Sequence, residues 1–168
     1  MAYLLDANVF IAAKNLHYGL DFCPAFWDWL IEQNDAGKVF SVEKVGDEVL
    51  AVEDELSQWA ESRGDQFFLR PDESVFPSLA AVATWASGKS YEPSAISTFL
   101  QVADYYLVAQ AHAGRYTVVT HERPAASARK IKIPDACIGL DIKCVTPFEM
   151  LRRERARFVL GQSHEPHE

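Results

Sequence analysis

Short apolar runs alternate with longer segments of helical periodicity along most of this chain. Residues 3–5, 39–42, 117–120 and 142–145 have the length and the apolar character of strands, and residues 66–69 form either a small strand or an extended link. Helical spacing and turn signals predict the helices between them, which are 9–13, 22–36, one from 43, one around 56–60, 72–86, 94–113, 134–137 and one from 147 to about 160.

This alternation predicts an α/β domain of three layers, α/β/α, around a mostly parallel sheet of four to five strands. We expect one domain over residues 1–160 and a polar tail over residues 161–168. The length of 168 residues and the hydrophobic content of 49% suit a single domain with a sizeable core.

The chain has no feature of a membrane or secreted protein. No apolar run approaches the roughly 20 residues that span a bilayer, and the first residues lack the basic and apolar regions of a signal peptide. Cys23, Cys137 and Cys144 form no CxxC pair and have no histidine at zinc spacing, which predicts buried, reduced thiols. We therefore expect a cytoplasmic protein.

The net charge of −8 argues against a protein that holds nucleic acid by bulk electrostatic attraction. It does not exclude a nuclease, because bound divalent cations would offset local carboxylates. Basic residues are also clustered, at 129–132 and at 152–157. Each cluster is either a nucleic-acid contact or an ordinary solvated face.

Asp6 is the first acid with a position that suggests chemistry. It follows the predicted first strand, and the carboxyl edge of a parallel sheet is where ligands bind. An aspartate just before a helix is equally well explained as its N-cap. Asp6 alone therefore does not decide between the two roles.

Asp104 is the second such acid, within the apolar run 99–109. Helical spacing places Leu100, Asp104, Leu107 and Ala111 on one face. An unpaired charge facing the core would cost several kcal/mol, so this carboxylate needs a metal ion, a lysine or an arginine. The alternative is a buried aspartate that is satisfied by hydrogen bonds to a neighbouring loop.

Two further acids come from the segments after the second and fourth strands. Glu48 lies on the helix after the second strand, where exposed glutamates are commonplace and where Glu43 and Asp47 compete with it. Glu122 lies just beyond the fourth strand, at the same edge as Asp6. We expect these acids to approach Asp6 if the parallel sheet forms.

Asp135 and His121 complete the candidates. Asp135 follows Pro134 at the start of a short helix, where N-terminal capping would also explain it. His121 is either a base, a nucleic-acid contact or a loop residue with no chemical role.

Four segments together resemble the PIN domain. They are Leu-Leu-Asp-Ala-Asn-Val-Phe at 4–10, Val-Gly-Asp-Glu-Val-Leu at 45–50, Ala-Asp-Tyr-Tyr-Leu-Val-Ala-Gln-Ala at 103–111 and Thr-Val-Val-Thr-His-Glu at 117–122. The resemblance covers nearly the whole chain in the expected order. In length the chain is similar to the toxin ribonucleases of bacterial toxin–antitoxin pairs.

The resemblance implies metal-binding carboxylates at Asp6, Glu48 and Asp104, with a fourth acid after the fourth strand. Many PIN domains have aspartate where Glu122 stands here. The segment Lys-Ile-Pro-Asp-Ala-Cys, which contains Asp135, resembles a less-studied PIN-like branch. The choice between Glu122 and Asp135 stays open.

The function implied is that of a Mg²⁺- or Mn²⁺-dependent endoribonuclease that hydrolyses RNA phosphodiesters and leaves 5′-phosphate and 3′-hydroxyl ends. Bound metal ions would orient and deprotonate the attacking water. Asn8 and Thr120 would hold a carboxylate or a water, although turn and strand chemistry explains them equally well. The family also implies an RNA substrate, a cognate antitoxin and a homodimer.

Two other functions compete with the nuclease. A phosphatase of the haloacid dehalogenase type also begins with a strand and an aspartate, but it needs a second aspartate at the position of Asn8. A catalytically inactive PIN-like module that binds protein or RNA is the other alternative, and the net acidic charge favours it slightly.

Overall fold

The computed structural model describes residues 1–161, and its centre is a parallel sheet of five strands in the order β3-β2-β1-β4-β5. All four neighbouring pairs are parallel, which confirms the predicted α/β class. The alternative left open at residues 66–69 is settled, because Phe68–Leu69 pairs with the second strand. The strands are β1 (Tyr3–Leu5), β2 (Val39–Val42), β3 (Phe68–Leu69), β4 (Thr117–Val119) and β5 (Cys144–Val145).

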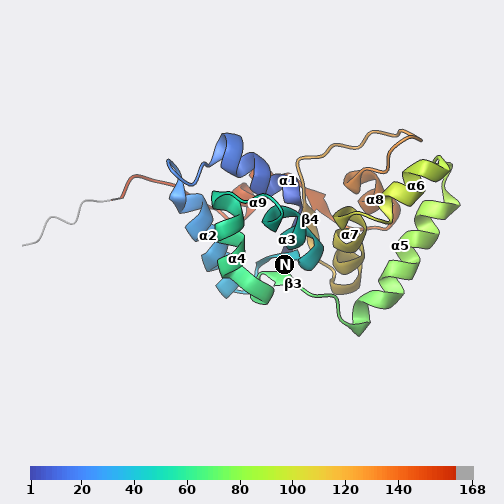
Figure 1. Ribbon diagram of the computed structural model, residues 1–168, viewed down its shortest axis with the longest axis horizontal. Coiled ribbons are helices and arrows are strands. Elements are labelled where there is room, and N and C mark those ends of the chain that lie inside the picture. Colours follow the sequence, from blue (N-terminus) through green and yellow to red (C-terminus); the bar gives the residue numbers. More distant parts are fainter. Residues whose placement is uncertain (162–168) are drawn as a thin grey trace, which may run out of the picture.

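Helices cover both faces of the sheet (Figure 1). One layer contains α1, α2, α4 and α9, and the other contains α5, α6, α7 and α8. The predicted three-layer arrangement is therefore confirmed. The helices are α1 (Ala7–Ala12), the π-helical η1 (Ala13–His17), α2 (Pro24–Asp35), α3 (Glu43–Leu50), α4 (Glu55–Arg63), α5 (Phe76–Gly88), α6 (Pro93–Phe99), α7 (Ala103–Gly114), α8 (Ile133–Gly139) and α9 (Pro147–Arg153), with 3₁₀ turns at Gly64–Gln66 and Glu73–Val75.

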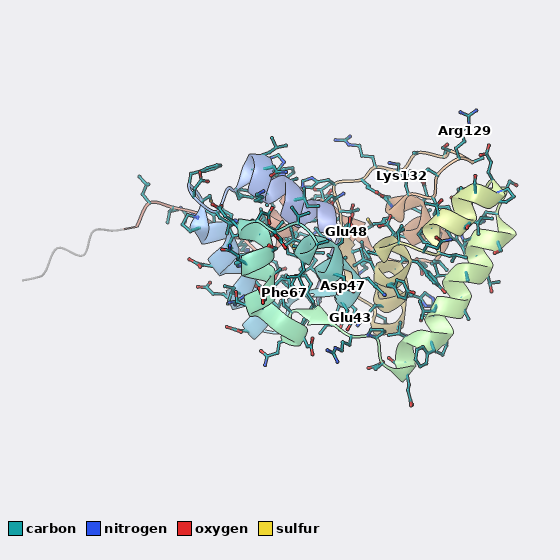
Figure 2. All side chains as sticks on the ribbon, in the orientation of Figure 1. Glu43, Asp47, Glu48, Phe67, Arg129 and Lys132 are labelled. Atoms are coloured by element: carbon teal, nitrogen blue, oxygen red, sulfur yellow. The ribbon has the colours of Figure 1, made fainter. Side chains whose placement is uncertain are left out.

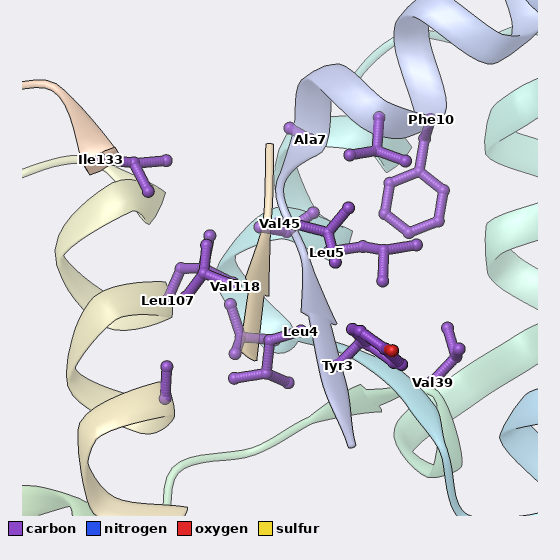
Figure 3. Close-up of a cluster of buried hydrophobic side chains, with 14 of the residues drawn as sticks. Tyr3, Leu4, Leu5, Ala7, Phe10, Val39, Val45, Leu107, Val118 and Ile133 are labelled. Atoms are coloured by element: carbon purple, nitrogen blue, oxygen red, sulfur yellow. The ribbon is translucent and has the colours of Figure 1, made fainter. Parts of the chain in front are cut away.

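The central strand β1 lies in the middle of the core. Its three side chains are at most 1% exposed, since helices cover both faces of this parallel sheet. Figure 3 shows Leu107 and Ile133 on one side of the strand and Phe10 and Val39 on the other. Burial on both faces explains why β1 is an uninterrupted apolar run and why its end is well fixed.

The prediction of one helix over 94–113 is wrong, because the chain breaks between α6 and α7. Val102 has extended backbone angles (φ −109°, ψ 168°), and its N–H donates to the Phe99 carbonyl three residues back, which ends α6 tightly. Asp104 therefore lies in the first turn of α7 rather than in the middle of a long helix. That position is favourable, since the helix dipole stabilises negative charge near an N-terminus.

The last helix is also shorter than predicted. The capping box at its start is confirmed, with the Glu149 N–H donating to the Thr146 Oγ1 at 3.1 Å. The helix ends at Arg153 instead of near residue 160, because Arg155 adopts a left-handed backbone (φ 54°) and the Ala156 N–H closes back onto the Leu151 carbonyl. Most of the expected polar tail, from residue 162, lies outside the described residues.

The structure bears on two further predictions, one about membrane helices and one about the cysteines. Within residues 1–161, no helix combines the length and the apolar character needed to cross a membrane. The three cysteines are free thiols, but the prediction that all of them are buried is confirmed only for Cys137, since Cys23 and Cys144 are partly exposed.

A hydroxyl in β2 fixes the end of β1, and removing it should destabilise the fold. The buried Ser41 Oγ donates to the Leu5 carbonyl at 2.6 Å, one residue before Asp6. We expect Ser41→Ala to lower the free energy of unfolding by about 1–2 kcal/mol, because the Leu5 carbonyl loses a buried partner. Urea denaturation would measure this. Ser62→Ala, at an exposed hydroxyl on α4, is the control and should change stability by less than about 0.5 kcal/mol; equal losses would refute the prediction.

Candidate active site

Four of the predicted acids line one cleft of about 640 Å³ at the carboxyl edge of the sheet. They are Asp6, Glu48, Asp104 and Glu122. Asp6 directly follows β1, and Glu122 follows β4 by three residues. The other two come from helices, Glu48 from α3 and Asp104 from the first turn of α7. The parallel sheet thus brings together residues that are far apart in the sequence.

Asp6 is both a helix cap and a wall of the cleft. It is only 5% exposed, and its Oδ1 accepts a hydrogen bond from the Ala7 N–H at 2.7 Å at the start of α1. Its Oδ2 accepts from the Thr120 hydroxyl at 2.8 Å. Burial, followed by the nearby carboxylates of Asp104 and Glu122, raises the pKa of Asp6 from 3.8 to about 7, against the opposing hydrogen bond from Thr120.

Thr120 is the centre of the hydrogen-bond network behind the acids. Its hydroxyl donates to Asp6 and accepts from the Asn8 Nδ2 at 3.2 Å and from the Glu122 N–H at 3.0 Å. The Asn8 Oδ1 accepts from the His121 N–H at 3.2 Å. Both predicted helper residues therefore tie the end of β1 to the segment after β4.

The structure places Glu122 in the cleft and Asp135 outside its lining. The Glu122 Oε2 accepts a hydrogen bond of 2.9 Å from the Ile133 N–H, at the first residue of α8. The Asp135 carboxylate instead accepts from the Ala125 N–H at 3.2 Å, in the loop between β4 and α8. Of the two acids left open by the sequence, only Glu122 therefore faces Asp6 and Asp104.

Asp104 carries a charge that its surroundings do not fully balance. Burial is the largest cause that raises its pKa from 3.8 to about 6, followed by the charges of Glu122 and Glu48. Lys130 acts in the opposite direction and lines the same cleft. Within residues 1–161, no other residue donates a hydrogen bond to this carboxylate, so the alternative of an aspartate satisfied by a neighbouring loop lacks the hydrogen bonds that it requires.

The three acids on α3 differ in their surroundings, and Figure 2 labels Glu43, Asp47 and Glu48 along this helix. Asp47 lines the cleft beside Glu48. Glu43 does not line it, and its Oε2 pairs with the Arg70 Nε at 3.1 Å. Of the two competitors of Glu48, only Asp47 therefore shares its cleft.

Two lysines in the cleft were not predicted as site residues. Lys44 and Lys130 both line it. Lys130 belongs to a basic cluster visible in the sequence, but Lys44 has no such signal. They provide positive charge beside the carboxylates.

His121 does not join the lining of the cleft. Its ring packs against His17 and Phe148, with centroids at 5.5 and 5.6 Å. Burial, and then the nearby His17, lowers the pKa of His121. His121 contributes to the site through its backbone N–H, which donates a hydrogen bond to the Asn8 Oδ1.

The donor chemistry of the cleft fits a hydrated hard cation. Among the described residues 1–161, no three histidine, cysteine, aspartate or glutamate side chains are arranged so that they could hold one metal ion together. Mg²⁺ differs from metals that need a complete protein cage, since it usually keeps several waters and binds one or two carboxylates. The carboxylates of Asp6 and Asp104 suit that mode, since both line the cleft and the charge of Asp104 contributes to the raised pKa of Asp6.

Neutralising Asp104 should stabilise the metal-free protein in a pH-dependent way. The folded-state pKa of about 6 exceeds the ordinary 3.8, so folding stability falls as the pH rises from about 4 to 6. We expect Asp104→Asn to remove this loss. It should raise the free energy of unfolding by about 3 kcal/mol at pH 8 and by close to zero at pH 4.

Urea denaturation in the presence of a chelator would measure the difference at both pH values. Asp28→Asn, at an exposed position on α2, is the matched control and should show no such pH dependence. A destabilised Asp104→Asn at pH 8 would contradict the prediction.

Comparison with known proteins identifies the family of this chain by sequence. No curated protein and no solved structure matches the chain. A family described as a domain of unknown function, DUF4411, matches residues 3–158, which include all of β1 to β5 and every residue that lines the cleft. The chain therefore belongs to the DUF4411 family.

Proposed function

We propose that this domain is a PIN-like, Mg²⁺- or Mn²⁺-dependent endoribonuclease that hydrolyses RNA phosphodiesters in the acidic cleft. One observation supports this most directly. Asp6 is almost fully buried and shares its surroundings with Asp104 and Glu122, so that the pKa values of Asp6 and Asp104 are both raised. Holding three carboxylates together in a buried site costs free energy, and a bound cation or proton would lower that cost by offsetting their negative charge.

We assign separate roles in the proposed reaction to the residues of the cleft. Asp6 and Asp104 would bind the cation, which supplies positive charge that polarises the phosphodiester and activates a water. Thr120 and Asn8 hold Asp6 in place through their hydrogen bonds. Lys44 and Lys130 lie in the same cleft, where their ammonium groups suit the phosphate oxygens of a substrate.

Glu122 adds a carboxylate whose position is set by the backbone. The Ile133 N–H at the start of α8 and the Thr120 hydroxyl fix its two ends, one at the carboxylate and one at the backbone. A carboxylate fixed in this way can accept a proton or orient a water without first reorganising. We assign it this role in preference to Asp135.

Loss of either central aspartate should abolish metal-dependent RNA cleavage. We expect Asp6→Asn and Asp104→Asn each to lower the rate by at least about 100-fold, since changes to residues that merely support a metal ligand already cost about 10- to 100-fold. Cleavage of total RNA with Mn²⁺, in the presence and absence of a chelator, would measure this. Asp28→Asn should cleave like the wild type. Full activity in both cleft variants would refute the assignment.

The choice between the two remaining acids has its own test. Glu122→Gln keeps an oxygen that can accept from the Ile133 N–H, so the fold should survive while cleavage falls. Asp135→Asn should retain most of the activity, because its carboxylate bonds the Ala125 N–H away from the cleft lining. Rate measurements on the same RNA would compare them, and the reverse order of activities would transfer the role to Asp135.

A binding module without catalysis is the second candidate function. It is favoured by the fact that no three potential ligand side chains within residues 1–161 converge on one ion. Calorimetric titration with Mn²⁺ separates the two functions. Binding that is lost in Asp104→Asn supports the nuclease, and no binding by the wild type supports the module.

The phosphatase has less support than either. The Asn8 amide is engaged with Thr120 and the His121 N–H, and it cannot serve as the second acid that this mechanism needs. Hydrolysis of small phosphate esters by the purified protein would reverse this ranking.

We extend the proposal to the role of a toxin that acts in the cytoplasm as a homodimer and is inhibited by a cognate antitoxin. Exposed apolar side chains beside the cleft offer a surface for a partner. Ile11 lines the cleft and is 40% exposed, and Val52 is 59% exposed in a hollow that Ile11 and Glu48 also line. Co-purification with the product of the adjacent gene, and loss of RNA cleavage in that complex, would test the pairing.

A further inference from the structure

A second hollow, of about 230 Å³, lies next to the acidic cleft between α6 and the loop of residues 121–132. Its floor is apolar, since Ala95, Phe99 and Ile131 line it and are 3–5% exposed. Ser94 and Thr98 add hydroxyls from the same face of α6. We call this hollow the α6 pocket.

The α6 pocket adjoins the cleft. Thr98, Val102, Asp104 and Lys130 line both. A ligand in the pocket would therefore lie next to the carboxylates of the cleft. One of the proposed metal-binding acids, Asp104, forms part of the boundary.

The loop that forms the outer wall of the pocket is fixed to the fold. Figure 1 shows the segment between β4 and α8 arching over α7 and α8 toward α6, and Figure 2 places Arg129 and Lys132 along it. The Glu92 N–H, just before α6, donates to the Ala128 carbonyl at 2.8 Å. Ile131, within the loop, is buried. The wall is therefore a built part of the structure.

Two cations stand at the mouth of the pocket. Arg129 and Lys130 line it and are exposed, and the Arg129 Nε lies 4.0 Å from the Glu92 Oε1. An apolar floor with an aromatic ring, two hydroxyls and a cationic mouth would suit a ligand with a flat apolar face, polar edges and a phosphate.

We propose that the α6 pocket binds one unstacked nucleobase of the RNA substrate, next to the phosphodiester in the cleft. This inference rests on the proposed nuclease function and adds a subsite to it. The pocket is smaller than the roughly 300–1,000 Å³ of sites for drug-sized ligands, which suits a single base. Single-stranded RNA is recognised in this way, by bases that leave the stack, contact aromatic side chains and present their edges to polar groups.

The hydroxyls of Ser94 and Thr98 give the pocket a means to distinguish bases. Within the described residues, neither hydroxyl makes a side-chain hydrogen bond, so both are available to the edge of a base. Arg129 and Lys130 would bind the adjoining phosphate, which directs the chain from the pocket into the cleft.

The test is binding of fluorescein-labelled tetranucleotides of A, C or U to the full-length protein, with Ca²⁺ in place of Mg²⁺ to limit cleavage. We expect the wild type to prefer one base by at least about fivefold. Ala95→Leu fills the pocket from its floor and should weaken binding of the preferred tetranucleotide at least about tenfold, with loss of the preference. Ser97→Leu, on α6 but outside the pocket lining, is the matched control and should bind like the wild type.

Thr98→Leu is a second variant that keeps the test decisive if Ala95→Leu does not fold. Thr98 is exposed and lines the boundary between pocket and cleft, so its replacement should not disturb the core. We expect a similar loss of binding and preference. Wild-type affinity and preference in both variants, or no binding by the wild type, would overturn the α6 pocket as a subsite.

Cleavage assays separate this inference from the proposed function. A wild type that binds with a base preference removed by both variants, but that cleaves no RNA, supports the pocket while the nuclease assignment fails. A wild type that cleaves RNA at the same sites and rates as both variants supports the nuclease while the pocket fails.

Discussion

The buried carboxylate of Asp6 is the constraint around which this structure is arranged. The strand before it has no exposed face, so its end cannot move toward water without disturbing the core. Among residues 1–161, two hydrogen bonds, from the Ala7 N–H and the Thr120 hydroxyl, partly compensate its burial. Because Asp104 and Glu122 lie close enough to oppose its ionisation, the metal-free site holds its charge at a cost in stability. The two carboxyl groups whose pKa values are raised most by burial and by neighbouring acids therefore lie in the cleft of the proposed chemistry, and perturbed pKa values of this kind are a common feature of active sites.

The rigidity of the site comes from connections between strand ends. Thr120 links Asp6, Asn8 and the Glu122 backbone, while the Glu122 carboxylate reaches the start of α8. These bonds join β1, β4 and α8, which are separated by more than a hundred residues at the widest point. A carboxylate held in this way cannot rotate away from the neighbouring negative charges. The repulsion between the carboxylates is then reduced by a bound proton or a bound cation.

Periodicity and strand order were enough to predict the sheet and the location of Asp6, because a parallel sheet aligns its carboxyl edges whatever the loops do. The same reasoning placed Asp104 in a single long helix and missed the break after Phe99, since no proline or glycine marks residues 100–102. The end of α9 was missed for a similar reason, because Arg155 adopts the left-handed conformation that usually signals glycine. Glu122 and Asp135 could not be separated, because their directions depend on a loop whose path is set by contacts with α6 and α8.

The loop of residues 121–132 also bears on how the proposed site would bind a cation and a substrate phosphate together. Residues 1–161 offer no three side chains that converge on one ion, so a Mg²⁺ ion there would keep positions for water and for substrate phosphate. The loop carries Lys130 to the boundary of the cleft and the α6 pocket, where a phosphate would meet both the lysine and the cation. Metal and RNA would then bind more tightly together than either does alone, because the cation would offset the repulsion between the carboxylates and the substrate phosphate. A cation site of this design would be weakly occupied in the absence of substrate, which would suit the proposed nuclease.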